Sequence, residues 1–207
     1  MKNLAILGAG GHGKVAANIA EQLGWNIHFF DLAYPTVTHC GHWQVLGDEQ
    51  SLIKHASRYD AVFVAIGNNE IRATKQQEIK ALGFTITSLI SPNATLSEYI
   101  EIGEGVLIVD NACINIGTTI ADGVIINTGA NIDHDNILGA YSHISPGVNI
   151  AGDVTIGQQS WIGIGSSIIH QITIADNVIV GAGAVIINDV PANVTVVGCP
   201  ARIAHKH

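Results

Sequence analysis

The most informative absence is that of basic residues from the second half of the chain. All nine Lys and Arg residues lie before residue 90 or in the C-terminal tail, whereas residues 90–190 carry ten Asp and Glu residues. With a formal net charge of −8, the protein lacks the basic surface that binds nucleic acids. A phosphate-bearing ligand must therefore meet backbone amides, the N-terminal half of the chain or the tail.

Other scarce features narrow the class of protein further. Charged residues make up 13% of the chain, yet no apolar stretch reaches the length of a membrane span, so we expect no membrane insertion. The first three residues lead directly into a short strand and a Gly-rich turn, and no signal peptide is expected. The three cysteines, Cys40, Cys113 and Cys199, form no CxxC motif and favour a reduced, cytoplasmic protein.

What is abundant is an aliphatic residue at every sixth position from Ile90 to Ile186. A helix would repeat at 3.6 residues and an ordinary strand at 2, whereas a period of six predicts a β-helix of hexapeptide turns. Three hexads make one triangular coil of eighteen residues. We therefore predict a left-handed parallel β-helix over residues 90–207, with about five coils followed by the tail.

The other positions of the hexad agree with this prism. The residue four after each aliphatic is usually small or Val and should also point inward; Ile100, Asn136 and Ile172 depart from this pattern. Gly or Asn recurs directly after the aliphatic position, at Gly103, Asn127, Gly139, Gly157, Gly163 and Gly181. We expect these residues to supply the positive φ angles of the corners.

Residues 1–89 are predicted to form a Rossmann-like α/β domain built on a βαβ unit. Strands are expected at 4–7, 27–30 and 61–66, and helices at 14–23 and 70–82. Between the first strand and helix, Gly8, Gly10 and Gly13 form a GxGxxG motif, which lets a diphosphate approach the backbone and the helix N-terminus. A tight structural turn without a ligand is the alternative.

The size of this domain favours a nucleotide-sugar over NAD. NAD normally spans two mononucleotide-sized halves, and only one is present. Asp31, at the end of the second strand, is placed to accept hydrogen bonds from a ribose or base. His12 and Lys14 lie where a diphosphate would bind, and both are expected to be cationic there.

Two histidines of the prism are candidates for proton transfer. His134 and His143 are nine residues apart, half a coil, and their places in the hexad predict that both line the outer surface on different faces or edges. A neighbouring carboxylate would orient His134 and raise its basicity. Solvated corner residues are the alternative, and the favoured one for His170. No two of these histidines are five residues apart, so a zinc site of the γ-carbonic anhydrase kind is not expected.

Four segments together resemble the sugar O/N-acetyltransferases of the NeuD and PglD type. They are GAGGHG at residues 8–13, AIGNNEIR at 65–72, the Asn127, His134-Asp135 and His143 constellation, and VGCPAR at 197–202. The resemblance covers essentially the whole chain. It implies an acetyl-CoA-dependent N-acetyltransferase of glycan biosynthesis, acting without a metal on the 4-amino group of a UDP-linked 4-amino-4,6-dideoxy sugar. It also implies a homotrimer with active sites between adjacent prisms.

The resemblance assigns a role to each candidate residue. His134 is the general base, Asp135 polarises it, and Asn127 lies near the reacting amine. The acetyl-CoA channel is assigned His143, Ile164 and Ala182. The nucleotide-sugar is assigned Gly10, Gly11, His12, Asp31 and Gly67. Asp135 stands where relatives usually have Glu, and Ala182 where Gly is common.

Two questions stay open at the level of sequence. The acceptor group could be a sugar hydroxyl, as in sialic acid modification, or the chain could be a non-catalytic scaffold that kept its sugar-binding unit. Arg202 is the first cation after the last hexad, so we expect it to meet the 3′-phosphate of CoA. The alternative is that Arg202 only caps the end of the prism.

Overall fold

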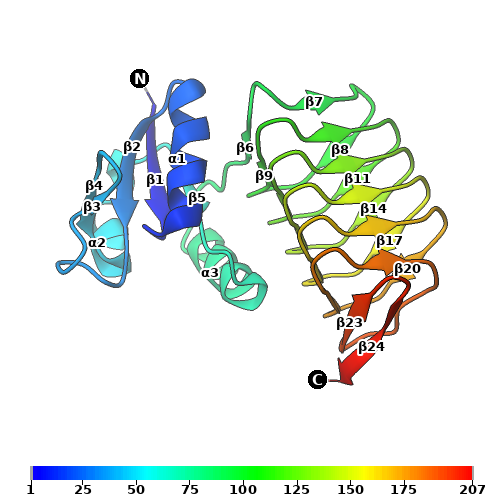
Figure 1. The fold of residues 1–207 in the computed structure, drawn as a ribbon. Helices are drawn as coiled ribbons and strands as arrows, with labels where there is room; N and C mark the ends of the chain where they lie inside the picture. The colour runs from blue at the N-terminus through cyan, green and yellow to red at the C-terminus, as the bar shows by residue number, and fades with distance from the viewer. Residues whose placement is uncertain (1, 207) are drawn as a thin grey trace. The chain divides into compact units, whose positions relative to one another are not determined.

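The computed structural model describes residues 2–206 and divides into two compact units, one up to Pro92 and the other from Asn93 onward (Figure 1). The boundary expected from the sequence, after residue 89, lies just before this division. No helix among residues 2–206 is long and apolar enough to cross a membrane.

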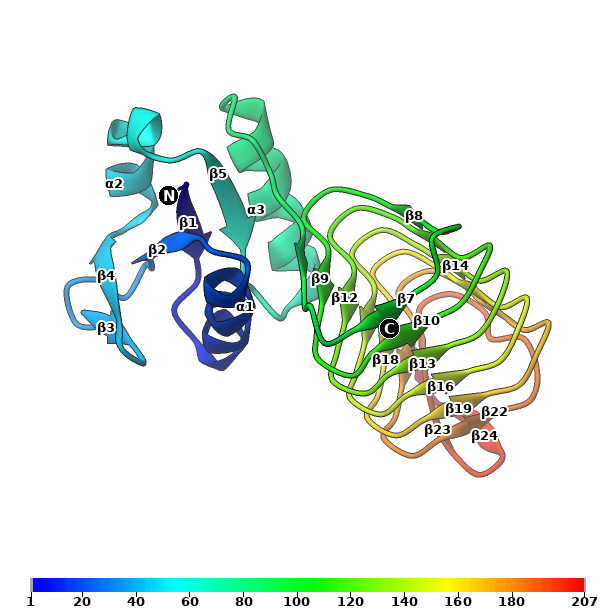
Figure 2. The ribbon, with the colours of Figure 1, turned by 90° about the horizontal axis from the view of Figure 1, so that it is seen from above.

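The first unit is a five-stranded sheet with helices on both faces. Its strands are β1 (Asn3–Leu7), β2 (Asn26–Phe30), β3 (His39–Cys40), β4 (Trp43–Gly47) and β5 (Ala61–Val64), in the order β3-β4-β2-β1-β5. Its helices are α1 (Gly11–Gln22), α2 (Glu49–Lys54), the 3₁₀ turn η1 (Ala56–Arg58) and α3 (Asn69–Ala81). All pairs are parallel except β3 with β4. Figure 2 shows α1 on one face and α2 and α3 on the other.

The alternation of β1 explains this layering. Ala5 and Leu7 join a buried cluster with Leu52 of α2 and Ile79 of α3. Residues of a strand alternate between the faces, so Leu4 and Ile6 point to the α1 side, where both are fully buried. The sequence predicted β1, β2, β5, α1 and α3, but α1 begins earlier than expected, at Gly11. It did not predict β4, or β3 and α2, which are short.

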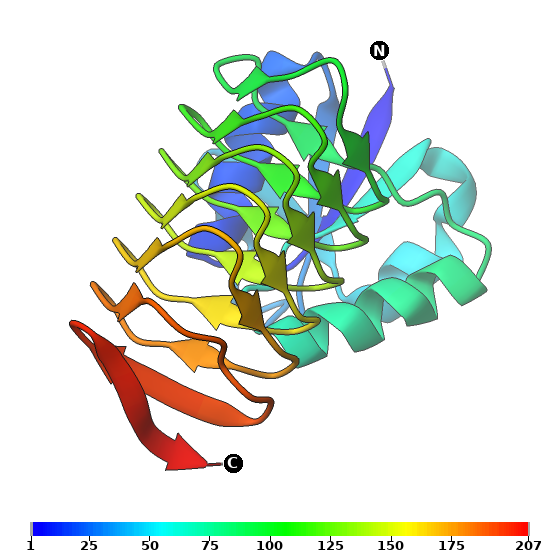
Figure 3. The same cartoon turned by 90° about the vertical axis from the view of Figure 1, so that its right-hand side faces the viewer.

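The second unit is the predicted triangular prism (Figure 3). One face consists of β7 (Thr95–Leu96), β10 (Cys113–Ile114), β13 (Asn131–Ile132), β16 (Asn149–Ile150), β19 (Ser167–Ile168) and β22 (Val185–Ile186). The next consists of β8 (Glu101–Ile102), β11 (Thr119–Ile120), β14 (Ile137–Leu138), β17 (Thr155–Ile156) and β20 (Thr173–Ile174). The third consists of β9 (Leu107–Ile108), β12 (Ile125–Ile126), β15 (His143–Ile144), β18 (Trp161–Ile162) and β21 (Ile179–Val180). The short strand β6 (Leu89–Ile90) precedes them in the chain.

The strand register confirms the eighteen-residue coil. Ile114 pairs with Ile132 and Ile132 with Ile150, and the same spacing holds on the other faces. These aliphatic side chains are buried, as the period of six predicts. Every strand of the three faces, from β7 to β22, is parallel to its neighbours on the same face, and the fold is the left-handed β-helix expected from the sequence.

The positive φ angles occupy a different position in the hexad from the predicted one. They fall on the third residue after each aliphatic, without interruption from Gly105 to Gly183. Gly103, Gly139, Gly157, Gly163, Gly181 and Asn127 are not among them. A side chain on those glycines would instead strike the next coil or strand, as at Gly139, where a Cβ would lie 2.6 Å from Gln158 N. These glycines are therefore required by the close stacking of coils, not by their own backbone angles.

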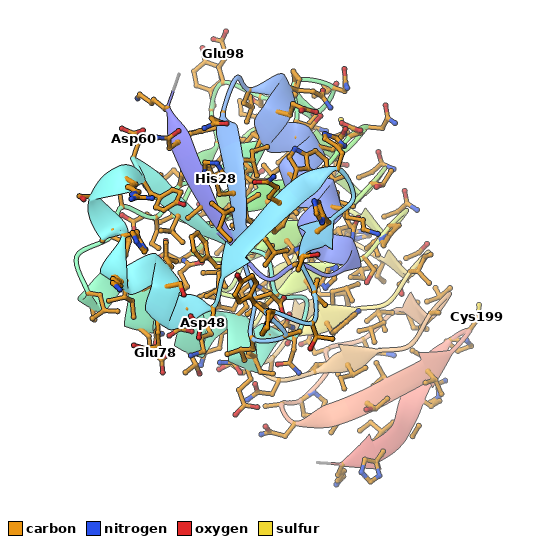
Figure 4. The ribbon with its side chains drawn as sticks, turned by 90° about the vertical axis from the view of Figure 1, so that its left-hand side faces the viewer. His28, Asp48, Asp60, Glu78, Glu98 and Cys199 are labelled. Carbon is orange, nitrogen blue, oxygen red and sulfur yellow. The ribbon has the colours of Figure 1, made fainter. Side chains whose placement is uncertain are left out.

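The chain ends in an antiparallel hairpin that extends the third face. β23 (Val194–Gly198) pairs with β21, and β24 (Ala201–Lys206) pairs with β23. Cys199 lies in the turn between β23 and β24 (Figure 4). The hairpin closes the apolar end of the last coil, where Val194 and Val196 are buried.

Candidate functional site

His134 and Asp135 form a hydrogen-bonded pair in the turn after β13. The Nδ1 atom of His134 donates to Oδ2 of Asp135 over 2.8 Å, and the backbone N–H of His134 donates to Oδ1 of Asp133 over 2.9 Å. The His134 side chain is 54% exposed, so its ring is accessible to a ligand. Since Nδ1 carries the proton toward Asp135, the Nε2 atom is left as the basic nitrogen.

The surrounding carboxylates make this imidazole more basic than an ordinary one. The hydrogen bond that His134 donates to Asp135 raises the pKa of His134. Desolvation, the next largest effect, lowers this pKa, and the negative charges of Asp133, Asp135 and Asp153 raise it. A stronger base removes a proton from a reacting group more readily.

The His134 ring lies against the backbone of the following coil at Gly152. A Cβ atom on Gly152 would lie 2.5 Å from Cε1 and 2.6 Å from Nε2 of His134. Gly152 has no positive φ angle, so a glycine is required here because the His134 ring occupies the space where a side chain would lie. The sequence did not single out Gly152, although its position eighteen residues after His134 was a signal for it.

A groove on the third face collects four other predicted residues. It has a volume of about 530 Å³ and is lined by three columns of residues that repeat every eighteen positions. The lining includes Asn127, His143, Ile164 and Ala182. His134 and Asp135 are not among the lining residues. Within one chain, the basic pair and the groove therefore stand on different parts of the prism.

His143 faces outward, as predicted, but it is 7% exposed rather than part of an open surface. Trp161, one coil further along the same face, covers it with ring centroids 4.6 Å apart and an interplanar angle of 31°. Trp161 is held in turn by a hydrogen bond from its Nε1 atom to Oγ of Ser145 over 2.9 Å. Asn127 Nδ2 donates to Nε2 of His143 over 3.3 Å. Trp161 and Ser145 shape the wall of the groove, and neither was predicted from the sequence.

Arg202 lies outside this groove. It is paired with Val197 in the terminal hairpin and borders a second hollow with Asp189 and Pro191. Its Nη1 atom donates to the carbonyl of Ala201 over 2.7 Å.

In the first unit, the glycine motif forms the expected turn between β1 and α1. Gly8 has a φ angle of 110°, and a Cβ on Gly13 would strike the carbonyl of Gly8. Around Gly10, Gly11 and Gly67, by contrast, the space where a Cβ would point is open. Open space beside glycine backbone at a helix N-terminus allows a phosphate to approach closely.

Asp31 braces the glycine turn. Its Oδ2 atom accepts from the N–H of Ala9 over 2.7 Å and its Oδ1 atom from the N–H of Ala33 over 2.8 Å. A carboxylate has further lone pairs for a ligand, but its position here is fixed by the backbone.

The prediction of a cationic His12 is wrong. Burial lowers the pKa of His12 to about 4, and the positive charge of Arg72 acts in the same direction. His12 is therefore neutral near pH 7, and it offers a ligand hydrogen bonds in place of charge.

Arg72 is a fully buried residue that the sequence analysis gave no individual role. Its guanidinium donates to the carbonyls of Ile66 and Gly67 over 3.0 and 3.1 Å, and to Oδ1 of Asn69 over 2.9 Å. These bonds hold the loop that contains Gly67 beside the N-terminus of α3. Among residues 2–206, no group of three or more His, Cys, Asp and Glu side chains is arranged to hold a metal.

Comparisons with known proteins agree with these features. Residues 3–79 match the PglD N-terminal domain, and residues 153–188 match the bacterial transferase hexapeptide (six repeats). The acetyltransferase domain of PglB from Neisseria gonorrhoeae FA1090, solved in complex with acetyl coenzyme A, is 40% identical, with a TM-score of 0.92 over 98% of both chains. The chain belongs to the PglD-type family of sugar N-acetyltransferases.

Two further relatives extend the comparison. PerB from Caulobacter crescentus, in complex with CoA and GDP-perosamine, is 34% identical with a TM-score of 0.93, over 98% of this chain and 97% of that chain. WeeI from Acinetobacter baumannii AYE is 29% identical with a TM-score of 0.91, over 98% of this chain and 100% of that chain. Family membership confirms the resemblance seen in the sequence and identifies the protein as an acetyltransferase.

Proposed function

We propose that the protein transfers the acetyl group of acetyl-CoA to the 4-amino group of a UDP-linked 4-amino-4,6-dideoxy sugar, as in a bacillosamine-type pathway of glycan biosynthesis in the cytoplasm. The observation that carries the proposal is the His134–Asp135 hydrogen bond of 2.8 Å in a family whose relatives bind CoA and a nucleotide-linked amino sugar. The open glycine backbone at Gly10, Gly11 and Gly67 supports binding of the nucleotide diphosphate.

The proposed reaction is a direct transfer with His134 as general base. The sugar amine attacks the thioester carbon, and its proton passes to Nε2 of His134 as the C–N bond forms. The tetrahedral intermediate then collapses and its C–S bond breaks. The leaving thiolate takes up the proton held on Nε2 of His134, and CoA departs as a thiol. Asp135 stabilises the imidazolium that forms between these steps, and Asn127 lies near the amine. No acyl-enzyme is needed.

Acetyl-CoA is the cosubstrate, and we assign it to the groove lined by His143, Ile164 and Ala182. The groove is apolar along Ile164 and Trp161, which suits the pantetheine arm. From β21 the same face continues through β23 to β24, which carries Arg202. We assign Arg202 to the 3′-phosphate of CoA at the end of this face; its bond to the Ala201 carbonyl leaves other guanidinium donors for a phosphate, which supports the assignment.

The separation of the basic pair from the groove supports a homotrimer. His134 follows β13 on one face, whereas His143 stands in β15 on another. A second copy of the prism that sets its groove beside His134 completes the site. The proposed active sites therefore lie between subunits.

The acceptor is tested with a panel of 4-amino-4,6-dideoxy sugars linked to UDP, GDP and dTDP, with release of free CoA thiol as the readout. We expect the UDP compound to give the highest kcat/KM. Calorimetry should likewise show binding of UDP and none of NAD. A preference for GDP would overturn the assignment of UDP but leave the amine acceptor, whereas turnover only with a hydroxyl-bearing sugar would identify an O-acetyltransferase.

Removing the negative charge of Asp135 should shift the pH dependence of the reaction. The hydrogen bond that His134 donates to Asp135 is the main reason that the pKa of His134 is raised above 6.5. A general base works only when unprotonated, so the acid limb of the kcat profile lies above that value. In Asp135→Asn the limb should move to lower pH, and the plateau should fall because the base is weaker.

Asp153→Asn is the matched control for this measurement. Asp153 raises the pKa of His134 through its charge alone and has the same φ angle of 60° as Asp135. Its limb should move less than that of Asp135→Asn. Equal profiles for the wild type and Asp135→Asn would contradict the proposed role of Asp135.

His143→Ala should affect acetyl-CoA binding more than the chemical step. The substitution removes the ring under Trp161 and the acceptor of Asn127 Nδ2, so the groove wall loses its support. An aromatic pair contributes about 0.5–1.5 kcal/mol, so the KM for acetyl-CoA should rise about 2- to 10-fold. Steady-state kinetics provide the measurement. A fall in kcat with an unchanged KM would place His143 in the chemistry instead of the groove.

A further inference from the structure

Asn136 stands directly behind the turn that carries His134 and Asp135. It occupies the inward position of the hexad where most coils have a small residue or Val, and it is fully buried. A buried amide has to find hydrogen-bond partners, so its contacts indicate what the larger polar side chain does at this position.

The side-chain amide of Asn136 binds three carbonyl groups. Its Nδ2 atom donates to Asp133 O over 2.7 Å, to Ala151 O over 3.1 Å and to His134 O over 3.3 Å. Its Oδ1 atom accepts from the N–H of Val154 over 3.0 Å. The amide therefore joins the turn around His134 to the coil that follows it.

Hydroxyl residues occupy the hexad position of Asn136 in other coils, and their hydrogen bonds can be compared with those of Asn136. Ser160 donates to Ala175 O over 2.8 Å and accepts from Val178 N over 3.0 Å. Both partners lie in the following coil, as Ala151 and Val154 do for Asn136.

Thr118, one coil before Asn136 at the same corner, repeats the pattern. Its Oγ1 atom donates to Asp133 O over 3.1 Å and accepts from Asn136 N over 3.4 Å. Ser166, at the same hexad position, donates backward to Gly163 O over 2.6 Å and forward to Gly181 O over 3.2 Å, so the bond of Asn136 to Asp133 O has a counterpart. The additional bond of Asn136 to His134 O has no counterpart in these bonds of Thr118 and Ser166. Asn136 thus binds two carbonyls of the turn that presents the basic pair and one carbonyl of the following coil at the same time.

We propose that Asn136 is a positioning residue for the acetyl transfer, which holds the backbone of residues 133–135 so that His134 and Asp135 meet. The proposal rests on the proposed role of His134. Asp135 has a φ angle of 60°, and its neighbour His134 is exposed, while on the outer surface Asn115 Nδ2 donates to Oδ1 of Asp133 over 3.1 Å. The bonds from Asn136 hold the same turn from the interior.

The backbone of residues 133–135 determines how the neighbouring carboxylates are oriented toward the His134 imidazole. The charged groups around His134 are Asp133, Asp135 and Asp153. A looser turn lengthens the contact between His134 Nδ1 and Asp135 Oδ2 on average. The imidazole then becomes less basic and less well aimed at the amine.

Asn136→Thr tests the proposal with little risk to the fold. Thr118 occupies the same corner one coil earlier and also follows a residue with positive φ, Gly117, so Thr fits this backbone. Its hydroxyl has one proton where the amide has two, so it can restore the forward bonds to Ala151 and Val154 but cannot also hold the carbonyls of both Asp133 and His134. We expect kcat to fall about 10- to 100-fold, as for a reacting group displaced by a fraction of an ångström to 1 Å, with KM values unchanged.

The second readout is the titration of His134 by NMR, assigned with His134→Gln. In Asn136→Thr its pKa should move down toward the ordinary value for histidine. Ser160→Ala is the control, because it removes a similar buried hydroxyl bridge away from this turn, and it should keep both kcat and the His134 titration while losing some thermal stability.

The outcomes separate the positioning role from the proposed function. Wild-type kcat in Asn136→Thr, an unchanged His134 titration, or an equal loss of kcat in Ser160→Ala would each overturn the positioning role. If the wild type fails to acetylate any nucleotide-linked amino sugar while the His134 titration still moves in Asn136→Thr, the proposed function fails and the control of the turn by Asn136 stands.

Discussion

His134→Ala should lower kcat by roughly 10²–10⁴-fold, the usual contribution of a positioned general base. The imidazole is the group whose Nε2 atom is left free by the bond from Nδ1 to Asp135. The groove assigned to acetyl-CoA does not include His134, so binding of acetyl-CoA by calorimetry should stay close to that of the wild type. The measurement is the initial rate of thiol release at saturating substrates.

His170→Ala is the matched control for this substitution. His170 is an exposed histidine at the same position of the hexad, two coils after His134. Its removal should leave kcat and KM unchanged. Near wild-type turnover of His134→Ala at neutral pH would remove His134 from the mechanism.

Gly152→Ala should be nearly as damaging as a direct change to the base, although it adds only a methyl group. The new Cβ would lie 2.5 Å from the His134 ring, which must swing away. A misplacement of about 1 Å can cost on the order of 10²-fold in rate. The fold should persist, because Ala140 and Ala182 show that the same hexad position accepts a side chain. Circular dichroism and kcat measured on the same preparation test both statements.

A double-mutant cycle shows whether this loss passes through His134. Once the ring is gone, the added methyl group has nothing to displace, so Gly152→Ala in the His134→Ala background should cost little. Additive losses from the two substitutions would mean that Gly152 acts elsewhere.

The sequence predicted the features that repeat. A period of six over residues 90–186 determines the coil length, the inward residues and the parallel stacking, because each hexad imposes the same requirement on its neighbours. The GxGxxG turn was predicted for a similar reason: Gly8 and Gly13 satisfy local backbone demands that the order of residues expresses directly.

The errors and omissions arise from contacts between coils or between elements. His12 was expected to be charged, but its burial and the position of Arg72 depend on how α1 and α3 fold around the turn. The contact of Trp161 with His143 is visible in the sequence only once the eighteen-residue register is applied to it. The corner glycines were assigned to the wrong hexad position because Gly serves both positive φ and close approach, and composition alone does not separate these uses.

Residues with left-handed backbone angles recur at every sixth position from Gly105 to Gly183, so the fold of the prism depends on an unbroken spacing of six residues. Deleting a single residue would move every later inward aliphatic to the surface and would bring β-branched residues such as Val148, Val154 and Val178 onto left-handed positions that they tolerate poorly. Loss or gain of eighteen residues at once, by contrast, keeps every column aligned and changes only how many rungs the groove has. Changes of length in this half of the enzyme are therefore tolerated in whole coils, and the reach of the groove toward the terminal hairpin can change only in steps of one rung.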